Sequence, residues 1–138
     1  MKKEITTPNY PRVYAANKTC YWNIDASPGS RIELRFIDFR LETSYDCSYG
    51  YLQIYDGGNL SANALGPKHC GSTIPSIQIS LSNRLYLEWR SDGSEHFSGF
   101  KISFHSTGNS QLYGNLISSL RFEETLYDEV TISSDVLS

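Results

Sequence analysis

Apolar residues recur at every second position in six short segments of this chain, and no other feature restricts its fold as strongly. Side chains of a β-strand point alternately to opposite faces, so a period of two predicts strands with one buried and one polar face. Turn-forming residues such as Ser27-Pro28-Gly29 and Asp92-Gly93 separate the segments. The segments are residues 20–24, 32–36, 52–54, 77–81, 85–89 and 100–104. The pattern predicts an all-β protein with an antiparallel sandwich or barrel.

Residues 106–138 differ from the rest of the chain in composition. Residues 1–105 carry eleven basic and ten acidic residues, a net charge of +1, whereas residues 106–138 carry one basic and five acidic residues, a net charge of −4. Residues 106–110 are typical of a linker. Beyond it, Leu112, Leu116, Leu120 and Phe122 could form one face of a helix, and residues 129–133 could equally form a strand. We therefore predict one domain over residues 1–105 and a linker or tail over residues 106–138.

The chain carries no signature of an enzyme, a nucleic-acid-binding protein or a membrane-spanning protein. Its net charge is −3 and its basic residues are dispersed, which argues against a nucleic-acid groove. No apolar run approaches the roughly 20 residues that cross a bilayer. No nucleophile elbow, phosphate-binding loop or zinc-ligand spacing occurs. The sequons at Asn17 and Asn59 are candidate N-glycosylation sites and favour secretion, although any signal peptide would have to lie upstream.

Several motifs, in order and at matching spacing, resemble the CUB family over residues 5 to about 105. They are TPNYP (7–11), CYWNI (20–24), RIELRFIDFRLE (31–42), CSYGYLQIYDG (47–57), LGPKHCG (65–71) and SDGSEHFSGF (91–100). The resemblance implies a jelly-roll-like sandwich of two antiparallel sheets. It also implies an extracellular, non-catalytic module that binds proteins or mediates dimerisation.

The resemblance also implies how the three cysteines behave. Cys47 and Cys70 match the second disulfide of the family. Cys20 matches a cysteine whose partner lies upstream in the family, on an N-terminal strand that this chain lacks. A truncated chain start, an intermolecular disulfide or a buried thiol would each account for Cys20. The alternation places Cys20 on the inward face, which favours the buried thiol.

Many CUB domains bind calcium with three acids at one end of the sandwich, and the resemblance places two of them here. Glu42 matches the first acid, Asp92 matches the third, and Tyr10 is assigned to a supporting tyrosine. Ser94 and Glu95 match positions that supply backbone oxygens. The second acid falls on Gly50, which has no side chain to offer.

Two carboxylates in place of three predict weak or absent calcium binding, since calcium takes six to eight oxygen ligands. Asp46 or Glu95 could replace the missing acid, although ordinary surface carboxylates are the simpler interpretation. Gly50→Asp would then be expected to restore calcium affinity.

We expect an extracellular module that recognises a protein partner, with Tyr10, Glu42, Asp92 and Glu95 receiving a Lys or Arg of that partner. A spacer or dimerisation module without a ligand site is one alternative, which Gly50 favours. A carbohydrate-binding sandwich is another, which four or more tyrosines exposed on one face would favour.

Overall fold

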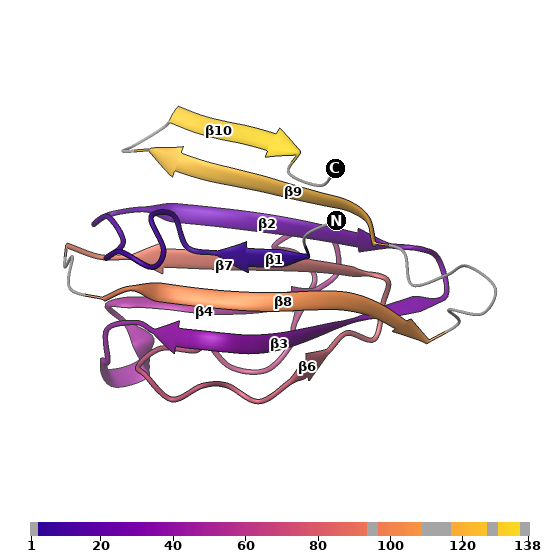
Figure 1. Ribbon diagram of the computed structural model, residues 1–138, viewed down its shortest axis with the longest axis horizontal. Coiled ribbons are helices and arrows are strands. Elements are labelled where there is room, and N and C mark those ends of the chain that lie inside the picture. Colours follow the sequence, from indigo (N-terminus) through magenta and orange to yellow (C-terminus); the bar gives the residue numbers. More distant parts are fainter. Residues whose placement is uncertain (1–2, 94–96, 109–116, 127–129, 136–138) are drawn as a thin grey trace.

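The computed structural model describes residues 3–93, 97–108, 117–126 and 130–135. It confirms the expected sandwich of two antiparallel sheets (Figure 1). The smaller sheet has the order β1 (Glu4–Thr6), β8 (Gly99–Gly108), β3 (Ser30–Arg40) and β6 (Gln78–Ile79). The larger sheet has the order β10 (Val130–Asp135), β9 (Ile117–Leu126), β2 (Thr19–Ala26), β7 (Arg84–Ser91), β4 (Gly50–Asp56) and β5 (Asn63–Ala64).

The inward face of most strands is the face that the alternation predicts. Along β2, Cys20, Trp22 and Ile24 are buried while their neighbours are not. Trp89 on β7 is fully buried, and its ring meets Phe100 of β8 across the sandwich at 6.4 Å between centroids. The two sheets therefore bury a single core cluster between them, as two amphipathic sheets must.

The structure extends one predicted strand and shows that another is wrong. β3 continues past residue 36, and its pairing with β8 shifts register between Phe36 and Asp38, so Phe39 is buried. Residues 77–81 form only the two-residue β6 at the edge of the smaller sheet, where Leu81 is 74% exposed. The buried residue there is Ser80, whose hydroxyl accepts a hydrogen bond from the Ile32 amide at 2.7 Å.

The chain beyond residue 105 continues the sandwich. β8 extends to Gly108, and β9 pairs with β2 antiparallel, with Trp22 opposite Phe122. Their ring centroids lie 5.3 Å apart, and Leu120 is 2% exposed. Leu120 and Phe122 thus lie on a strand and not on a helix, while Leu112 and Leu116 fall outside the described residues. The β9–β10 hairpin lies beside β2 at one side of the larger sheet (Figure 1).

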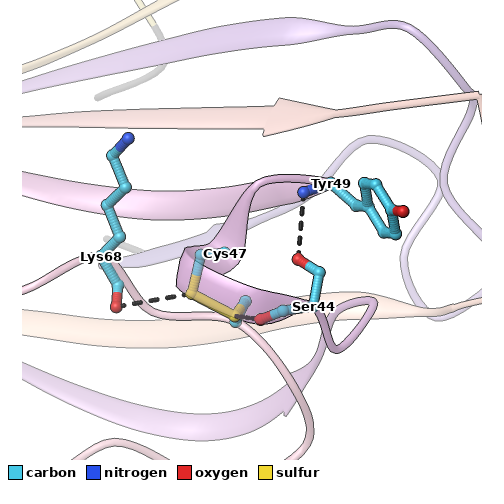
Figure 2. Close-up of a disulfide and its surroundings, with 5 residues drawn as sticks. Ser44, Cys47, Tyr49 and Lys68 are labelled. Carbon is cyan, nitrogen blue, oxygen red and sulfur yellow. Dashed lines mark hydrogen bonds between the residues drawn. A yellow bond between two sulfur atoms is a disulfide. The ribbon is translucent and has the colours of Figure 1, made fainter.

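The expected disulfide joins Cys47 to Cys70, with 5.6 Å between their Cα atoms (Figure 2). Cys47 ends the short 3₁₀ helix η1 (Tyr45–Cys47), which links β3 to β4. The Ser44 hydroxyl accepts a hydrogen bond from the Tyr49 amide at 3.0 Å, which closes the same turn (Figure 2). Cys20 is fully buried, as the inward phase of the alternation predicts.

Candidate functional site

Glu42 and Asp92 both act on the hydroxyl of one buried tyrosine, Tyr14, at the end of the sandwich. Glu42 follows β3, and Asp92 follows β7. Burial raises the pKa of the Tyr14 hydroxyl; a backbone hydrogen bond from Glu42 lowers it, and the Glu42 and Asp92 charges raise it. Two loops that lie far apart in sequence thus bring their carboxylates within electrostatic reach of a single hydroxyl.

Tyr14 is held firmly in this position. Its side chain is 4% exposed, and its ring packs edge-on against Trp89 with 5.2 Å between centroids. Its amide donates a hydrogen bond to the Phe97 carbonyl at 2.9 Å. Tyr14 is therefore part of the core as well as of the site, because its ring is buried while its hydroxyl lies within electrostatic reach of both acids.

Tyr14 is the tyrosine whose hydroxyl both acids influence, whereas the sequence assigned the supporting role to Tyr10. The Tyr10 hydroxyl donates a hydrogen bond to Asp38 Oδ2 at 2.8 Å, and this bond raises the Tyr10 pKa. The spacing Tyr-Pro-x-x-Tyr from Tyr10 was the available signal, since it offers two tyrosines and not one.

The adjoining loop segments are tied together by Ser91. Its hydroxyl donates to the Ala15 carbonyl at 2.9 Å and accepts from the Lys18 amide at 2.9 Å. The Asn17 amide donates to the Asp92 carbonyl at 2.8 Å. These bonds hold the segment after Tyr14 against the end of β7, which fixes the backbone that carries Asp92.

Gly50 meets a requirement of the backbone at this end. It begins β4, pairs with Ser91 and has φ +149°, a conformation that side chains disfavour. A Cβ atom at Gly50 would lie 2.9 Å from the Arg90 carbonyl oxygen. The strand pairing would have to shift to admit any side chain, so Gly50→Asp is not the simple restoration that the sequence suggested.

The residues at this end do not fit a calcium site built on three carboxylates. Glu42 and Asp92 are the two acids beside Tyr14, and Asp46 is exposed on η1. Across the described ranges, no group of three or more His, Cys, Asp or Glu side chains could hold a metal ion. Ser94 and Glu95 lie outside the residues that the structure describes.

A second polar cluster, which the sequence did not single out, covers the outer face of the larger sheet. Four tyrosines on three strands surround Glu88 there, and each is partly exposed: Tyr21, Tyr51, Tyr55 and Tyr86. Glu88 is 8% exposed and accepts hydrogen bonds from the Tyr51 and Tyr55 hydroxyls at 3.1 and 3.4 Å. We call these five residues the tyrosine face. In the sequence, these five residues stand at the positions that alternate with the buried apolar residues of their strands.

The four tyrosine hydroxyls of the tyrosine face stay protonated, because their pKa values are raised above the usual value for tyrosine. Burial, with the Glu123 carboxylate next, raises the pKa of Tyr86 to about 12. The Lys68 ammonium lies 4.3 Å from the centre of the Tyr51 ring, a cation–π contact at the border of the face. The hydroxyls therefore remain hydrogen-bond donors at physiological pH.

A family model described as "CUB domain" matches residues 1–104. The chain belongs to the CUB family. CUB domains are generally non-catalytic interaction modules, and the relatives of this chain are extracellular or secreted proteins. Within the described residues, no helix is both long and apolar enough to cross a membrane.

Relatives of this CUB domain are much longer proteins. Human Tolloid-like protein 1 is 38% identical over 103 residues, which are 75% of this chain and 10% of the relative. Cubilin of Rattus norvegicus is 39% identical over 101 residues, 72% of this chain and 3% of the relative. The chain thus spans a small part of the curated relatives that it matches.

Among solved structures, the MASP-1 CUB2 domain bound to Ca2+ is 31% identical to this CUB domain with a TM-score of 0.64. The match covers 73% of this chain and 88% of that domain. The calcium belongs to that structure; among the described residues of this chain, Glu42 and Asp92 are the two acids that act on Tyr14.

Proposed function

We propose that this CUB domain binds a protein partner through a Lys or Arg side chain that docks between Glu42 and Asp92. The observation that carries the proposal is the influence of both carboxylates on the Tyr14 hydroxyl. Acids on separate loops that share one buried neighbour can receive one compact cation, because each supplies a charge-assisted hydrogen bond. Such bonds contribute about 1.5–3 kcal/mol each, which suits a local anchor inside a larger interface.

In this proposal the partner's cation supplies the positive charge that a calcium ion supplies in CUB domains with three acids. Each carboxylate attracts a bound ammonium or guanidinium group, and the attraction is stronger at a partly buried position than in bulk water. Tyr14 adds a neutral hydroxyl that stays protonated, since burial and the two acids raise its pKa. The site therefore favours a cation with several donors over a metal ion that needs six or more oxygens.

The test uses a five-residue peptide with a central lysine as the probe, and the same peptide with glutamine as its control. The lysine peptide at millimolar concentration should shift the NMR amide signals of residues 41–43 and of Asp92. The glutamine peptide should leave them unchanged. The shifts should weaken as salt is added, because exposed charge pairs are screened.

Two variants make the test specific. Glu42→Gln and Asp92→Asn keep the shape of each side chain and remove its charge, so each should lower the affinity for the lysine peptide several-fold. Adding about 1 mM calcium, which is near the range for extracellular modules, should neither shift these signals nor raise the melting temperature. Equal shifts with the glutamine peptide, or binding that survives both variants, would overturn the proposal.

A further inference from the structure

A hollow of about 190 Å³ opens on the outer face of the larger sheet, at the end of the tyrosine face that Tyr21 and Tyr86 form, and its lining includes neither Glu42 nor Asp92. Tyr21 and Tyr86 form one wall, with their rings stacked at 5.6 Å and 25° between planes. Asn23, Arg121 and Glu123 supply polar groups to the lining. The volume lies below the roughly 300–1,000 Å³ of sites for drug-sized ligands, so the hollow suits a single ring-sized group.

The chemistry of this lining is that of a sugar site. A pyranose has apolar C–H faces that stack on aromatic rings, and hydroxyls that pair with amide, guanidinium and carboxylate groups around its rim. Asn23 also has an unsatisfied acceptor to which a sugar hydroxyl could donate a hydrogen bond. Its Oδ1 is buried with no hydrogen-bond partner among the described residues, although its Nδ2 donates to the Gly58 carbonyl at 3.4 Å.

The chain itself places a sugar acceptor at this hollow. Asn59, the asparagine of the sequon Asn59-Leu60-Ser61, is exposed and lines the same hollow. Its Oδ1 accepts a hydrogen bond from the Ser61 amide at 2.8 Å, so the turn uses the amide oxygen and not Nδ2. N-glycosylation requires that nitrogen.

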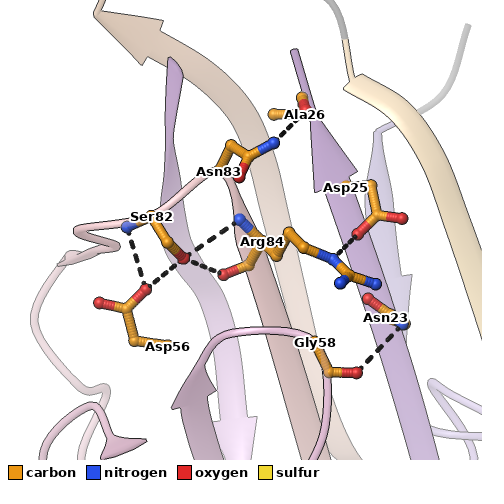
Figure 3. Close-up of polar contacts among 8 residues, drawn as sticks. All are labelled: Asn23, Asp25, Ala26, Asp56, Gly58, Ser82, Asn83 and Arg84. Atoms are coloured by element: carbon orange, nitrogen blue, oxygen red, sulfur yellow. Dashed lines mark hydrogen bonds and ion pairs between the residues drawn. The ribbon is translucent and has the colours of Figure 1, made fainter. Parts of the chain in front are cut away.

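The turn before Asn59 is held against the sheet, which fixes the position of the acceptor. The Asn23 side chain bonds to Gly58, and Arg84 Nε donates to Asp25 Oδ1 at 2.8 Å (Figure 3). A Cβ atom on Gly58 would lie 2.5 Å from the Arg84 guanidinium carbon, so a side chain there would displace the end of the Arg84 side chain. Asp56, at the start of the turn, accepts from the Ser82 amide at 3.1 Å (Figure 3).

We propose that Asn59 carries an N-linked glycan whose first N-acetylglucosamine packs into this hollow against Tyr21 and Tyr86. In the modification, Asn59 Nδ2 gives up one proton and bonds to the anomeric carbon of a lipid-pyrophosphate-linked oligosaccharide. The bond between that carbon and the pyrophosphate oxygen breaks, and the lipid pyrophosphate leaves with the electron pair. The glycan covers one end of the tyrosine face, which directs protein contacts to the rest of the molecule. The proposal requires an extracellular protein and is otherwise independent of the acidic site.

The test uses the full chain, secreted from a eukaryotic host behind a removable signal peptide. Mass spectrometry should find Asn59 occupied. After an endoglycosidase trims the glycan to its first sugar, NMR should show contacts between sugar protons and the Tyr86 ring. The trimmed protein should melt about 3 °C above Asn59→Gln, since one aromatic contact is gained. If Asn59→Gln is not secreted, Ser61→Ala removes the sequon instead.

Tyr86→Thr separates a packed glycan from one that only projects into solvent. Threonine retains a strand-favouring residue and removes the ring, so Asn59 should stay occupied while the sugar contacts and the gain in melting temperature disappear. Asn17→Gln, at the other sequon, should leave the sugar contacts at Tyr86 unchanged. The proposal is overturned if Asn59 is unoccupied, or if it is occupied and Tyr86→Thr leaves the sugar signals and the melting difference as they were.

Discussion

The two sides of the larger sheet are stabilised in different ways. On the side of β4, the Cys47–Cys70 disulfide and the tight Gly50 backbone join segments that the CUB motifs contain. On the side of β9, a hairpin outside the matched residues 1–104 covers β2, with no covalent link. The β4 side therefore depends on individual residues that a sequence motif can specify. The β9 side depends on how well an added strand pairs with β2 and packs its apolar residues against the core. A family motif therefore marks only part of what the sandwich needs.

Removing the hairpin should have the largest effect on stability. A chain that ends at Gly108 loses the buried Ile117 and Leu120 and the contact between Phe122 and Trp22. At about 1.5–3 kcal/mol for each buried side chain, the loss should reach about 5 kcal/mol or more. Urea unfolding would measure it, with a chain that ends at Leu126 as the control that retains β9. Equal urea midpoints for the chain ending at Gly108 and the full chain would mean that the hairpin contributes nothing to the stability of the sandwich.

Trp22→Ala should cost about 3–5 kcal/mol, the usual range for a buried tryptophan. Trp22 touches Phe100 in the smaller sheet and Phe122 in β9, with centroid distances of 5.6 and 5.3 Å. Part of the cost should therefore vanish in the chain that ends at Gly108, because the two changes share a contact. Thermal unfolding of the four proteins gives this coupling. If the two losses of stability add fully, the contact between Trp22 and Phe122 does not contribute to the cost of Trp22→Ala.

On the other side of the sheet, replacing Cys47 and Cys70 together by serine should cost about 3 kcal/mol, as expected for a loop of this length. The sequence separation of the two cysteines is 23 residues. The midpoint of urea unfolding should drop for the wild type under reducing conditions and stay constant for the double variant. Thiol labelling that finds Cys47 and Cys70 reduced in the secreted protein would contradict the structure.

Gly50→Ala should destabilise the domain by about 1–3 kcal/mol, because the new Cβ meets the Arg90 carbonyl at a positive φ. Gly93→Ala is the matched control, since a Cβ there has nothing within 4 Å. Gly50→Asp should lose stability similarly and gain no calcium-dependent rise in melting temperature. Such a rise would show that the strand end can shift and that Glu42, Asp92 and the new acid converge on an ion.

The smallest effect should come from His69, which lies between Phe36 and Phe39, with ring centroids 5.9 and 6.5 Å away. Burial lowers the His69 pKa, so the folded state disfavours its protonated form. The unfolded chain then binds more protons, and stability present above about pH 6.5 should decline as the pH falls through the lowered pKa. His69→Phe should flatten this decline between about pH 7 and 5 in urea unfolding. An unchanged profile would assign the pH dependence to other groups.

The sequence by itself determined the sandwich, most of its core and one covalent link. Alternation fixes which face of a strand is apolar, so Trp22, Leu87 and Ile102 could be assigned inward without coordinates. The spacing of the CUB motifs likewise identified the Cys47–Cys70 pair. These inferences succeeded because they depend on local periodicity or on motifs with fixed spacing.

Only the tertiary structure decided what lies beside each edge and each end. Residues 117–126 carry too weak a pattern to separate strand from helix, and their pairing with β2 supplies the hydrogen bonds and apolar cover that select the strand. Tyr14 in place of Tyr10, and the strain that a side chain at Gly50 would meet, both arise from loops that converge from distant positions. No short stretch of sequence specifies these contacts, because each depends on the strand register and on which loops meet once the distant segments have packed.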